Sequence, residues 1–425
     1  MTPSPRLSTL PVPPRLTSFL CGVAAFTLIP TLTNPPTSHP AELVTSTSRL
    51  VALARSLRKQ PAVAFDLESN GLHRYPEHIC LVQLATESES YILDPLAIGD
   101  MAALGELLQD ANVEKIFHSA DYDLRSLDRD WGFRVASLYD TSIAAHFTGI
   151  DHLGLATVLE LALGIKVEKD RRLQRADWTM RPLSARALDY AAADVAYLIP
   201  LRRRLAQALD AEGRTEWAEE ECARLARIEY SPPDSPEDAV FSMKGARALH
   251  GRELAVLREL LLLRDQEARR RNRPPYQVLS NDTLLALASN PDADLAEVPG
   301  VTRLVIARLG PAIRAALRKG KAAPPVDRPP REAPFQPRPT AAETQRLQQL
   351  KTWRTAEAEF LKLDAALIWP MASLERLARE PASIQRERDA PEVRVWQRRR
   401  FADSLRAMLE QPLTAPASPK PPTSA

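Results

Sequence analysis

The sequence predicts an α/β domain, with a mixed sheet flanked by helices, followed by two small all-helical domains. Three observations support this. Between residues 61 and 210, strand-like apolar runs alternate with helical periodicity, which is typical of a sheet covered by helices. From about residue 240 the periodicity is helical. Proline-rich stretches at residues 231–238 and 322–341 separate the parts.

The α/β domain is expected to begin with a capped amphipathic helix at residues 45–60. Four strands are predicted, at residues 61–69, 79–86, 90–95 and 113–120. A helix is expected at residues 100–111, another begins near Asp121, and several more follow through residue 210. Three early strands followed by a strand–helix–strand alternation favour a sheet that mixes antiparallel and parallel pairs.

The helical part contains two similar segments, residues 264–288 and 354–378, at a constant offset of 90 residues. The matched pairs are Arg264 with Arg354, Glu267 with Glu357, Ala268 with Ala358, Val278 with Ile368, Thr283 with Ser373, Leu284 with Leu374 and Leu287 with Leu377. Most of these positions are apolar or cap-like, which indicates two copies of one small helical fold. The alternative is chance similarity between two amphipathic stretches.

The composition shifts divide the chain into six segments. We expect a disordered extension or a misassigned start at 1–42, the α/β domain at 45–230, helical domains at 240–320 and 343–412, a proline-rich linker at 321–342 and a disordered tail at 413–425. The extension holds an apolar run, FLCGVAAFTLIPTL, that is too short to span a bilayer but could be the core of a signal peptide.

Charge and cysteine content limit the possible partners and the cellular compartment of the protein. The formal net charge is only +2, so any contact with nucleic acid must come from local basic patches. The three cysteines, Cys21, Cys80 and Cys222, show neither metal-ligand spacing nor a disulfide framework. They fit a reducing, cytoplasmic compartment, and we expect no association with a membrane.

Two carboxylates end the first predicted strand, in the stretch PAVAFDLES at residues 61–69. Asp66 and Glu68 are two residues apart, so a strand places them on the same face. Two acids side by side in a folded interior are costly unless a positive charge lies between them. The stretch therefore raises the question of which cation they hold.

Two further acidic signals lie downstream. Asp121 and Asp123 are both near the start of a predicted helix, where an acid is favourable in any case. Tyr190 and Asp194 are four residues apart and share one face of a later helix. Each signal alone is equally consistent with a helix cap or a surface pair.

Together, Asp66, Glu68, Asp123 and Asp194 would bring only oxygen ligands to one cleft. Such a site selects hard divalent ions, Mg²⁺ or Mn²⁺. Two such ions about 3.5–4 Å apart can activate a water and stabilise the leaving oxygen of a phosphodiester. Tyr190 could then orient the attacking water. Because a phenol is a poor base at neutral pH, positioning is favoured over full proton abstraction.

Three short motifs carry a family resemblance. Asp66-Leu67-Glu68, HSADYDL at 118–124 and YAAAD at 190–194 resemble the exonuclease motifs of the DEDD superfamily in its tyrosine-containing subgroup. Residues 163–201, with Lys169, Asp177-Trp178 and Arg181-Pro182-Leu183, resemble bacterial ribonuclease D. The repeated helical segments resemble its helicase-and-ribonuclease-D C-terminal (HRDC) domains, and the resemblance covers about residues 45–412.

The resemblance implies a ribonuclease H-like sheet and two metal ions held by the four acids, with Tyr190 holding the nucleophilic water. Asp121 is the rival of Asp123, but the family pattern places the acid five residues after His118 and before an aliphatic residue, here Leu124. One departure is that Ser69-Asn70-Gly71-Leu72 follows Glu68 where many relatives have an aromatic residue. Substrate contacts near Leu72 and His73 are therefore open.

Four residues are candidate substrate contacts, namely His118, Lys169, Trp178 and Arg181. Their alternatives are a strand-end histidine, a solvated basic loop and a packed tryptophan. The basic runs RRRNR at 269–273 and RRR at 398–400 could be solvated faces or phosphate contacts. Whether the helical domains bind RNA or support the fold is likewise open.

The predicted function is 3′–5′ exoribonuclease action on RNA 3′ ends, in tRNA maturation, releasing nucleoside 5′-monophosphates. The expected partner is RNA, with tRNA precursors as substrates, and the expected state is a cytoplasmic monomer. A 3′–5′ DNA exonuclease of the same superfamily is the alternative, because the acids alone do not distinguish RNA from DNA. A non-catalytic scaffold is the third reading, and it has no need for clustered carboxylates.

Overall fold

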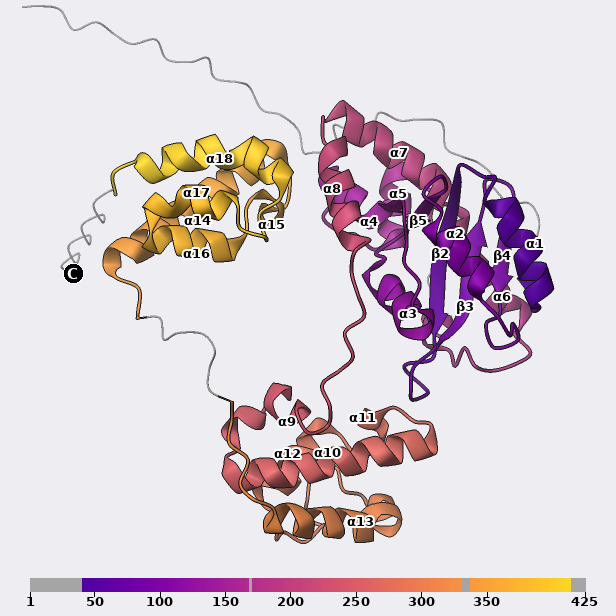
Figure 1. Ribbon diagram of the computed structural model, residues 1–425, viewed down its shortest axis with the longest axis vertical. Helices are drawn as coiled ribbons and strands as arrows, with labels where there is room; N and C mark the ends of the chain where they lie inside the picture. Colours follow the sequence, from indigo (N-terminus) through magenta and orange to yellow (C-terminus); the bar gives the residue numbers. More distant parts are fainter. Residues whose placement is uncertain (1–39, 168–169, 330–336, 414–425) are drawn as a thin grey trace, which may run out of the picture.

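The computed structural model describes residues 40–167, 170–329 and 337–413. The predicted extension and tail lie almost wholly outside these residues, as does part of the proline-rich linker. The first part of the chain is a six-stranded sheet with helices on both faces (Figure 1). The strands are β1 (Glu42–Val44), β2 (Ala62–Ser69), β3 (Ile79–Ala85), β4 (Ser90–Leu93), β5 (Glu114–Phe117) and β6 (Leu138–Asp140).

The strand order is β1-β4-β3-β2-β5-β6, and the sheet is mixed as predicted. β2 pairs antiparallel with β3 and parallel with β5, and β3 pairs antiparallel with β4. The four predicted strands are present. The two edge strands, β1 and β6, were not predicted, because three residues are too few to show a periodicity.

Strand β2 sits in the middle of the sheet and alternates between two cores. Val63 and Phe65 pack with the helices on one face, and Phe65 stacks on Phe117 at 5.2 Å. Asp66 and Glu68 point to the other face, which α6 crosses. The helices of this part are α1 (Thr47–Leu57), α2 (Ala102–Gln109), α3 (Asp121–Trp131), α4 (Thr141–Phe147), α5 (Leu155–Leu163), α6 (Ala185–Ala196), α7 (Leu198–Ala211) and α8 (Thr215–Leu225).

Two helical units follow. The first contains α9 (Ala239–Ser242), α10 (Gly251–Arg271), α11 (Pro275–Val278), α12 (Asn281–Ser289) and α13 (Arg303–Ala322). The second contains α14 (Ala341–Leu361), α15 (Ala365–Ile368), α16 (Met371–Arg379), α17 (Ile384–Arg388) and α18 (Val395–Glu410). Helices α14, α15 and α16 begin and end 90 residues after α10, α11 and α12, so the internal repeat is present in the structure.

The repeat extends to the end of its long helix. Asn272 and Lys362 follow α10 and α14, and both adopt the left-handed conformation, at φ 48° and 54°. The matched apolar pairs, such as Leu284 with Leu374, are buried in their own units. At the same offset α18 lies within the residues that match α13. The copies differ before it, because the short helix α17 matches residues 294–298 of the first unit, which are not helical.

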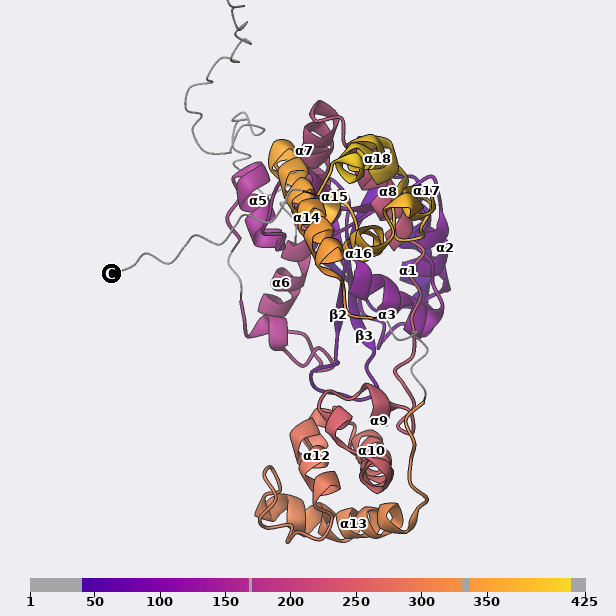
Figure 2. The same ribbon diagram turned by 90° about the vertical axis from the view of Figure 1, so that its left-hand side faces the viewer.

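The second helical unit shares a hydrophobic core with the α/β domain. Trp396 of α18 stacks on Trp217 of α8 at 4.6 Å and meets Phe147 edge-on at 5.3 Å. Arg394 pairs with Glu221 at 2.7 Å beside this cluster. The first unit instead has a core of its own. Figure 2 shows it at the opposite end of the molecule from the second unit.

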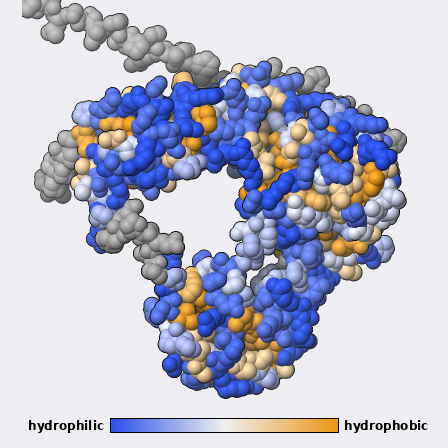
Figure 3. Space-filling model, viewed as in Figure 1, coloured by the Kyte–Doolittle hydropathy of each residue, from blue (hydrophilic) through white to orange (hydrophobic). Residues whose placement is uncertain are grey.

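Figure 3 shows the three parts arranged around an opening, with a largely hydrophilic exterior. None of the helices in the described ranges combines the length and hydrophobicity of a membrane-spanning segment.

Candidate active site

A cavity of about 400 Å³ opens beside the carboxyl-bearing end of β2. Its lining is Asp66, Glu68, His118, Leu155, Gln174, Tyr190, Asp194 and Leu198. Three of the four predicted acids and the predicted tyrosine therefore border one cavity. The fourth acid, Asp123, is 7% exposed, and its burial, together with the nearby charges of Asp66, Asp140 and Glu68, raises its pKa.

The turn before α3 fixes the position of Asp123. Ser119 has a positive φ of 63°, which is uncommon outside glycine. Asp140, fully buried at the end of β6, accepts hydrogen bonds from the backbone of Ser119 at 3.1 Å and of Ala120 at 2.7 Å. Sequence reasoning missed Asp140. The available signal was its cap motif, in which the same carboxylate accepts from Ser142 two residues later.

The two aspartates of the middle motif have different surroundings. Asp121 has a 60% exposed side chain and pairs with Arg125 one turn later at 2.9 Å. Asp123 is buried and faces the other acids. The structure thus places Asp123 next to the acids that line the cavity, and Asp121 at an exposed position away from them.

Replacing these two residues in turn tests that distinction. Asp123→Asn should reduce turnover as severely as a change at Asp66, because it removes a charge from the cluster. Asp121→Asn should leave turnover near wild type and lower stability by at most about 1 kcal/mol through a weaker helix start. Steady-state kinetics and thermal melts of both variants check this, and the reverse ranking would show a motif shifted by two residues.

Helix α6 brings Tyr190 and Asp194 to the cavity. Ser184 caps the helix by accepting from the backbone of Ala187 at 3.2 Å, which sets where the helix begins. Tyr190 stacks on Trp178 with ring centroids 6.2 Å apart. Gln174, a residue that sequence reasoning missed, borders the same cavity as Tyr190. The tyrosine ring is therefore packed against Trp178, with Gln174 beside the cavity.

Burial dominates the electrostatics of the acids. It raises the pKa of Asp66 to about 8 and of Glu68 to about 9, and neighbouring carboxylates add to both shifts. Burial likewise raises the pKa of Asp194 to about 6. No lysine or arginine is among the described residues that line the cavity. The negative charge of Asp66, Glu68 and Asp194 is thus not compensated by a basic side chain that lines the cavity.

A divalent ion fits the chemistry of these donors. All four are carboxylates, the ligands that Mg²⁺ and Mn²⁺ prefer. Within residues 40–167, 170–329 and 337–413, no three acidic, histidine or cysteine side chains already stand at the spacing of a metal-binding cluster. The positive charge of a bound ion would relieve the repulsion among the carboxylates.

The raised pKa values predict how pH affects the metal-free protein. An unfolded carboxyl has a pKa of about 4, so the folded acids bind more protons between there and about 9. Stability from this source is complete below the unfolded pKa and is lost as pH rises through the folded pKa.

The melting temperature in the presence of a chelator should therefore fall as pH rises across this window. It should fall less steeply for Glu68→Gln, which cannot ionise at that position. Parallel slopes for the two proteins would contradict the electrostatic account.

The candidate substrate residues have varied surroundings. Lys169 lies outside the described residues. His118 borders the cavity, and its ring nitrogens lie 2.9 Å from Thr141 Oγ1 and 2.7 Å from the Leu153 carbonyl oxygen. Substrate contact stays a prediction for both residues.

Trp178 and Arg181 have contacts that favour packing roles. Trp178 is 2% exposed and lies against Tyr190. Its indole N–H makes no hydrogen bond of standard geometry in the described residues, yet it lies near enough to Glu68 to favour that carboxylate's charged form. Arg181 donates to Asp94 at 2.6 and 2.8 Å and to the carbonyl oxygen of Cys80.

Comparison with known proteins identifies the family of this chain. A family model described as 3′-5′ exonuclease matches residues 41–210, and one described as HRDC domain matches residues 253–317. The ribonuclease D of Gluconacetobacter diazotrophicus is 34% identical over 373 residues, 86% of this chain and 92% of the relative. This chain belongs to the ribonuclease D family. The ribonuclease D of Granulibacter bethesdensis is 32% identical over the same shares of the two chains.

Solved structures agree with this family. The crystal structure of Escherichia coli RNase D, described as an exoribonuclease involved in structured RNA processing, matches with a TM-score of 0.62 and 26% identity. The match covers 87% of this chain and 99% of that one. The catalytic core of RRP6 from Trypanosoma brucei matches with a TM-score of 0.58 and 25% identity, over 70% of this chain and 83% of that one. The predicted fold class is confirmed.

Proposed function

We propose that the cavity beside β2 hydrolyses the terminal phosphodiester of an RNA 3′ end with two divalent metal ions and releases nucleoside 5′-monophosphates. As a member of the ribonuclease D family, the protein is a 3′–5′ exoribonuclease, a hydrolase that acts on RNA. Enzymes of this superfamily depend on divalent metal. The observation that carries the finer proposal is the convergence of Asp66, Glu68 and Asp194 on one cavity, with Asp123 behind them.

Asp66, Glu68, Asp123 and Asp194 would hold the ions, Mg²⁺ or Mn²⁺. When bound, such ions supply positive charge that polarises the phosphodiester and makes water a better nucleophile. The acids contribute by staying charged around that site. Burial, with the neighbouring carboxylates, raises the pKa of Asp66 and Glu68, and a nearby cation would favour their charged forms, which supports the proposal.

Tyr190 would position the attacking water. Burial and the nearby carboxylates raise the pKa of its phenol, so it stays protonated throughout the physiological range. A neutral phenol both donates and accepts one hydrogen bond, which suits orientation rather than proton abstraction. Trp178 stacks on the ring and supports its orientation for this role.

The substrates we propose are the 3′ ends of structured RNA, with tRNA precursors as the natural case. The support is the family and the exposed arginines Arg171 and Arg172, which line a second hollow that Tyr190 also borders. Arginines suit phosphate contacts that position a strand without reading its sequence.

We also propose a cytoplasmic monomer. The buried free thiols of Cys80 and Cys222 fit a reducing compartment.

The domain division belongs to the same proposal. We assign the exonuclease domain to residues 45–230, the first HRDC domain to 240–320 and the second HRDC-like domain to 343–412. The separate core of the first unit and the 90-residue repeat support these limits.

A product ladder tests the proposed function. The protein is incubated with 5′-labelled tRNA-like RNA and with DNA of matched sequence, each with Mg²⁺, with Mn²⁺ and with chelator. We expect stepwise shortening of the RNA from its 3′ end, only with metal, and nucleoside 5′-monophosphates as products. Equal or faster shortening of DNA would favour the DNA exonuclease. Internal cleavage, or activity in chelator, would contradict the mechanism.

A further inference from the structure

The loop between β2 and β3, residues 70–78, connects the first helical unit to the wall of the cavity. It follows directly after the strand that carries Asp66 and Glu68. Its side chains and backbone contact three other parts of the molecule, namely α3, the segment 173–179 and the helices α10 and α11.

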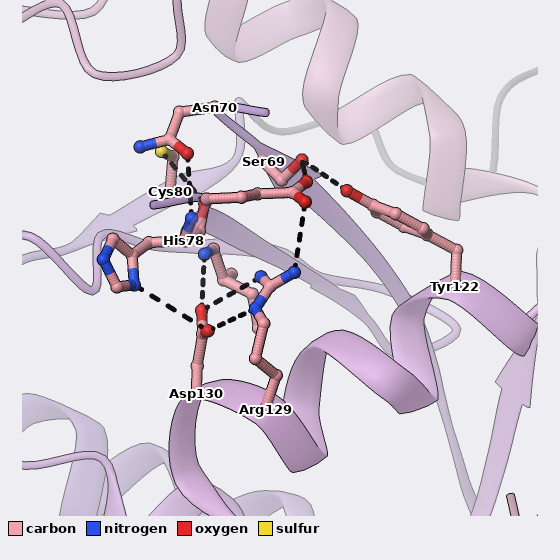
Figure 4. Close-up of polar contacts among 9 residues, drawn as sticks. Ser69, Asn70, His78, Cys80, Tyr122, Arg129 and Asp130 are labelled. Atoms are coloured by element: carbon pink, nitrogen blue, oxygen red, sulfur yellow. Dashed lines mark hydrogen bonds and ion pairs between the residues drawn. The ribbon is translucent and has the colours of Figure 1, made fainter. Parts of the chain in front are cut away.

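The base of the loop is fixed to the sheet and to α3, as Figure 4 shows. Asn70 is buried, and its Oδ1 accepts from the backbone of His78 at 2.8 Å. Ser69 Oγ donates to Glu77 at 2.7 Å, and Glu77 pairs with Arg129 of α3 at 3.2 Å. The two ends of the loop therefore form a stiff base.

The inner side of the loop contacts the segment that supports Tyr190. Arg74 pairs with Asp177 at 2.6 Å, and its Nε donates to Thr179 at 3.2 Å. His73 Nε2 lies 2.7 Å from the carbonyl oxygen of Arg175. This same segment contains Trp178, whose ring stacks on Tyr190, and Gln174, which lines the cavity with Tyr190. A displacement of the loop would therefore move the support of the tyrosine.

The outer side of the loop contacts the first helical unit. The phenol of Tyr75 donates to Asp265 of α10 at 2.6 Å, and its ring packs against the core of that unit beneath Arg269. The Tyr75 backbone donates to Asn272 at 3.1 Å. Hydrogen bonds to a carboxylate are stronger than those between neutral groups, so the Tyr75–Asp265 pair is the principal bond of this contact.

Two more bonds reach the tip of the loop from α11. The carbonyl oxygen of Leu72 accepts from the hydroxyl of Tyr276 and from Nε2 of Gln277, both at 3.0 Å. The basic run at 269–273 is thus partly occupied by this contact, since Arg269 and Asn272 both lie against Tyr75.

We infer that the first helical unit positions Tyr190 through the 70–78 loop, so that it contributes to the rate of hydrolysis and not only to the binding of RNA. The inference rests on the proposed function of the cavity. Tyr75 and Asp265 are positioning residues, because they act through the segment 173–179 and touch no reacting atom.

Short single-stranded RNA separates the two roles, since it is degraded at the cavity without long contacts to the helical unit. In the full chain, Tyr75→Phe removes only the hydroxyl that donates to Asp265. We expect kcat on short RNA to fall about three- to tenfold, with KM and melting temperature near wild type. Asp265→Asn should have a similar effect, and the double variant should be no worse than the single ones.

Two further variants sharpen the test. Gln277→Ala, at an exposed position, should lower kcat without disturbing a core. Arg270→Gln is the control, because Arg270 pairs with Glu267 of its own helix, and it should keep the wild-type kcat. In a Tyr190→Phe background, Tyr75→Phe should have little additional effect, since both changes act on the same phenol.

Wild-type kcat for both Tyr75→Phe and Gln277→Ala on short RNA would overturn the inference. So would an undiminished effect of Tyr75→Phe in the Tyr190→Phe background. A wild-type chain that does not shorten RNA with metal would instead refute the proposed function, so the two failures are distinguishable.

Discussion

Replacing Asp66 with Asn should lower turnover by several orders of magnitude while the fold survives. The amide keeps the size of the side chain but removes a charge from the site where cations must bind. Without metal, the variant should melt at a higher temperature than wild type, because burial and Asp194 make the charged carboxylate unfavourable there. Single-turnover kinetics at saturating Mn²⁺ and melts in chelator measure both effects.

Asp194→Asn should behave like Asp66→Asn. Asp121→Asn is the control, because its carboxylate is exposed and pairs with Arg125 on the same helix. Near-full activity of Asp66→Asn at saturating metal would show that the two-metal assignment is wrong.

Disrupting the contact between the second helical unit and the α/β domain should lower the stability of the protein more than any single change at the cavity. Trp396 is 3% exposed, stacks on Trp217 of the α/β domain and meets Phe147 of the same domain edge-on. Trp396→Ala should lower the free energy of unfolding by about 3–5 kcal/mol, because a large buried ring leaves a cavity. Urea titration followed by circular dichroism measures this loss.

Phe360→Ala is the matched control, since this aromatic residue of α14 is 76% exposed. It should leave the stability near wild type. If Trp396→Ala were as stable as Phe360→Ala, the second unit would not support the α/β domain. Deleting the second unit should likewise destabilise the remaining chain, because it would expose Trp217 and Phe147 to water.

Where the sequence carried a period, it predicted the structure well. The alternation of Val63 and Phe65 with Asp66 and Glu68 identified both the buried face of β2 and the acidic one. The 90-residue offset predicted the repeated helices, because a small helical fold needs the same buried positions in both copies, as at Leu284 and Leu374. These patterns depend on local burial, which a sequence records directly.

Contacts between distant segments were not predictable in the same way. Trp217 and Trp396 each look like core residues of their own domains, and only the fold shows that they bury one another. Asp140 reads as an ordinary helix cap, whereas it also fixes the turn before Asp123. Tyr75 follows a motif that departs from the family pattern, and its partner Asp265 lies 190 residues away.

The basic runs show the same limit. Each was open between a solvated face and a phosphate contact. In the structure, Arg399 pairs with Glu216 at 3.2 Å and Arg398 with Asp389 at 3.1 Å, while Arg269 lies over Tyr75. Part of this charge is therefore engaged within the protein. A run of arginines in the sequence predicts a local positive charge but not the acid with which each arginine pairs. The long side chains can reach acids on several elements.

The central claim is that the four acids act as one divalent-metal site. A calorimetric titration of Mn²⁺ into the full chain, in the presence of an RNA with a non-hydrolysable 3′ end, counts the bound ions directly. The account predicts about two Mn²⁺ per wild-type chain, fewer in Asp66→Asn and in Asp194→Asn, and an unchanged number in Asp121→Asn. The same stoichiometry and affinity in Asp66→Asn as in wild type would contradict it.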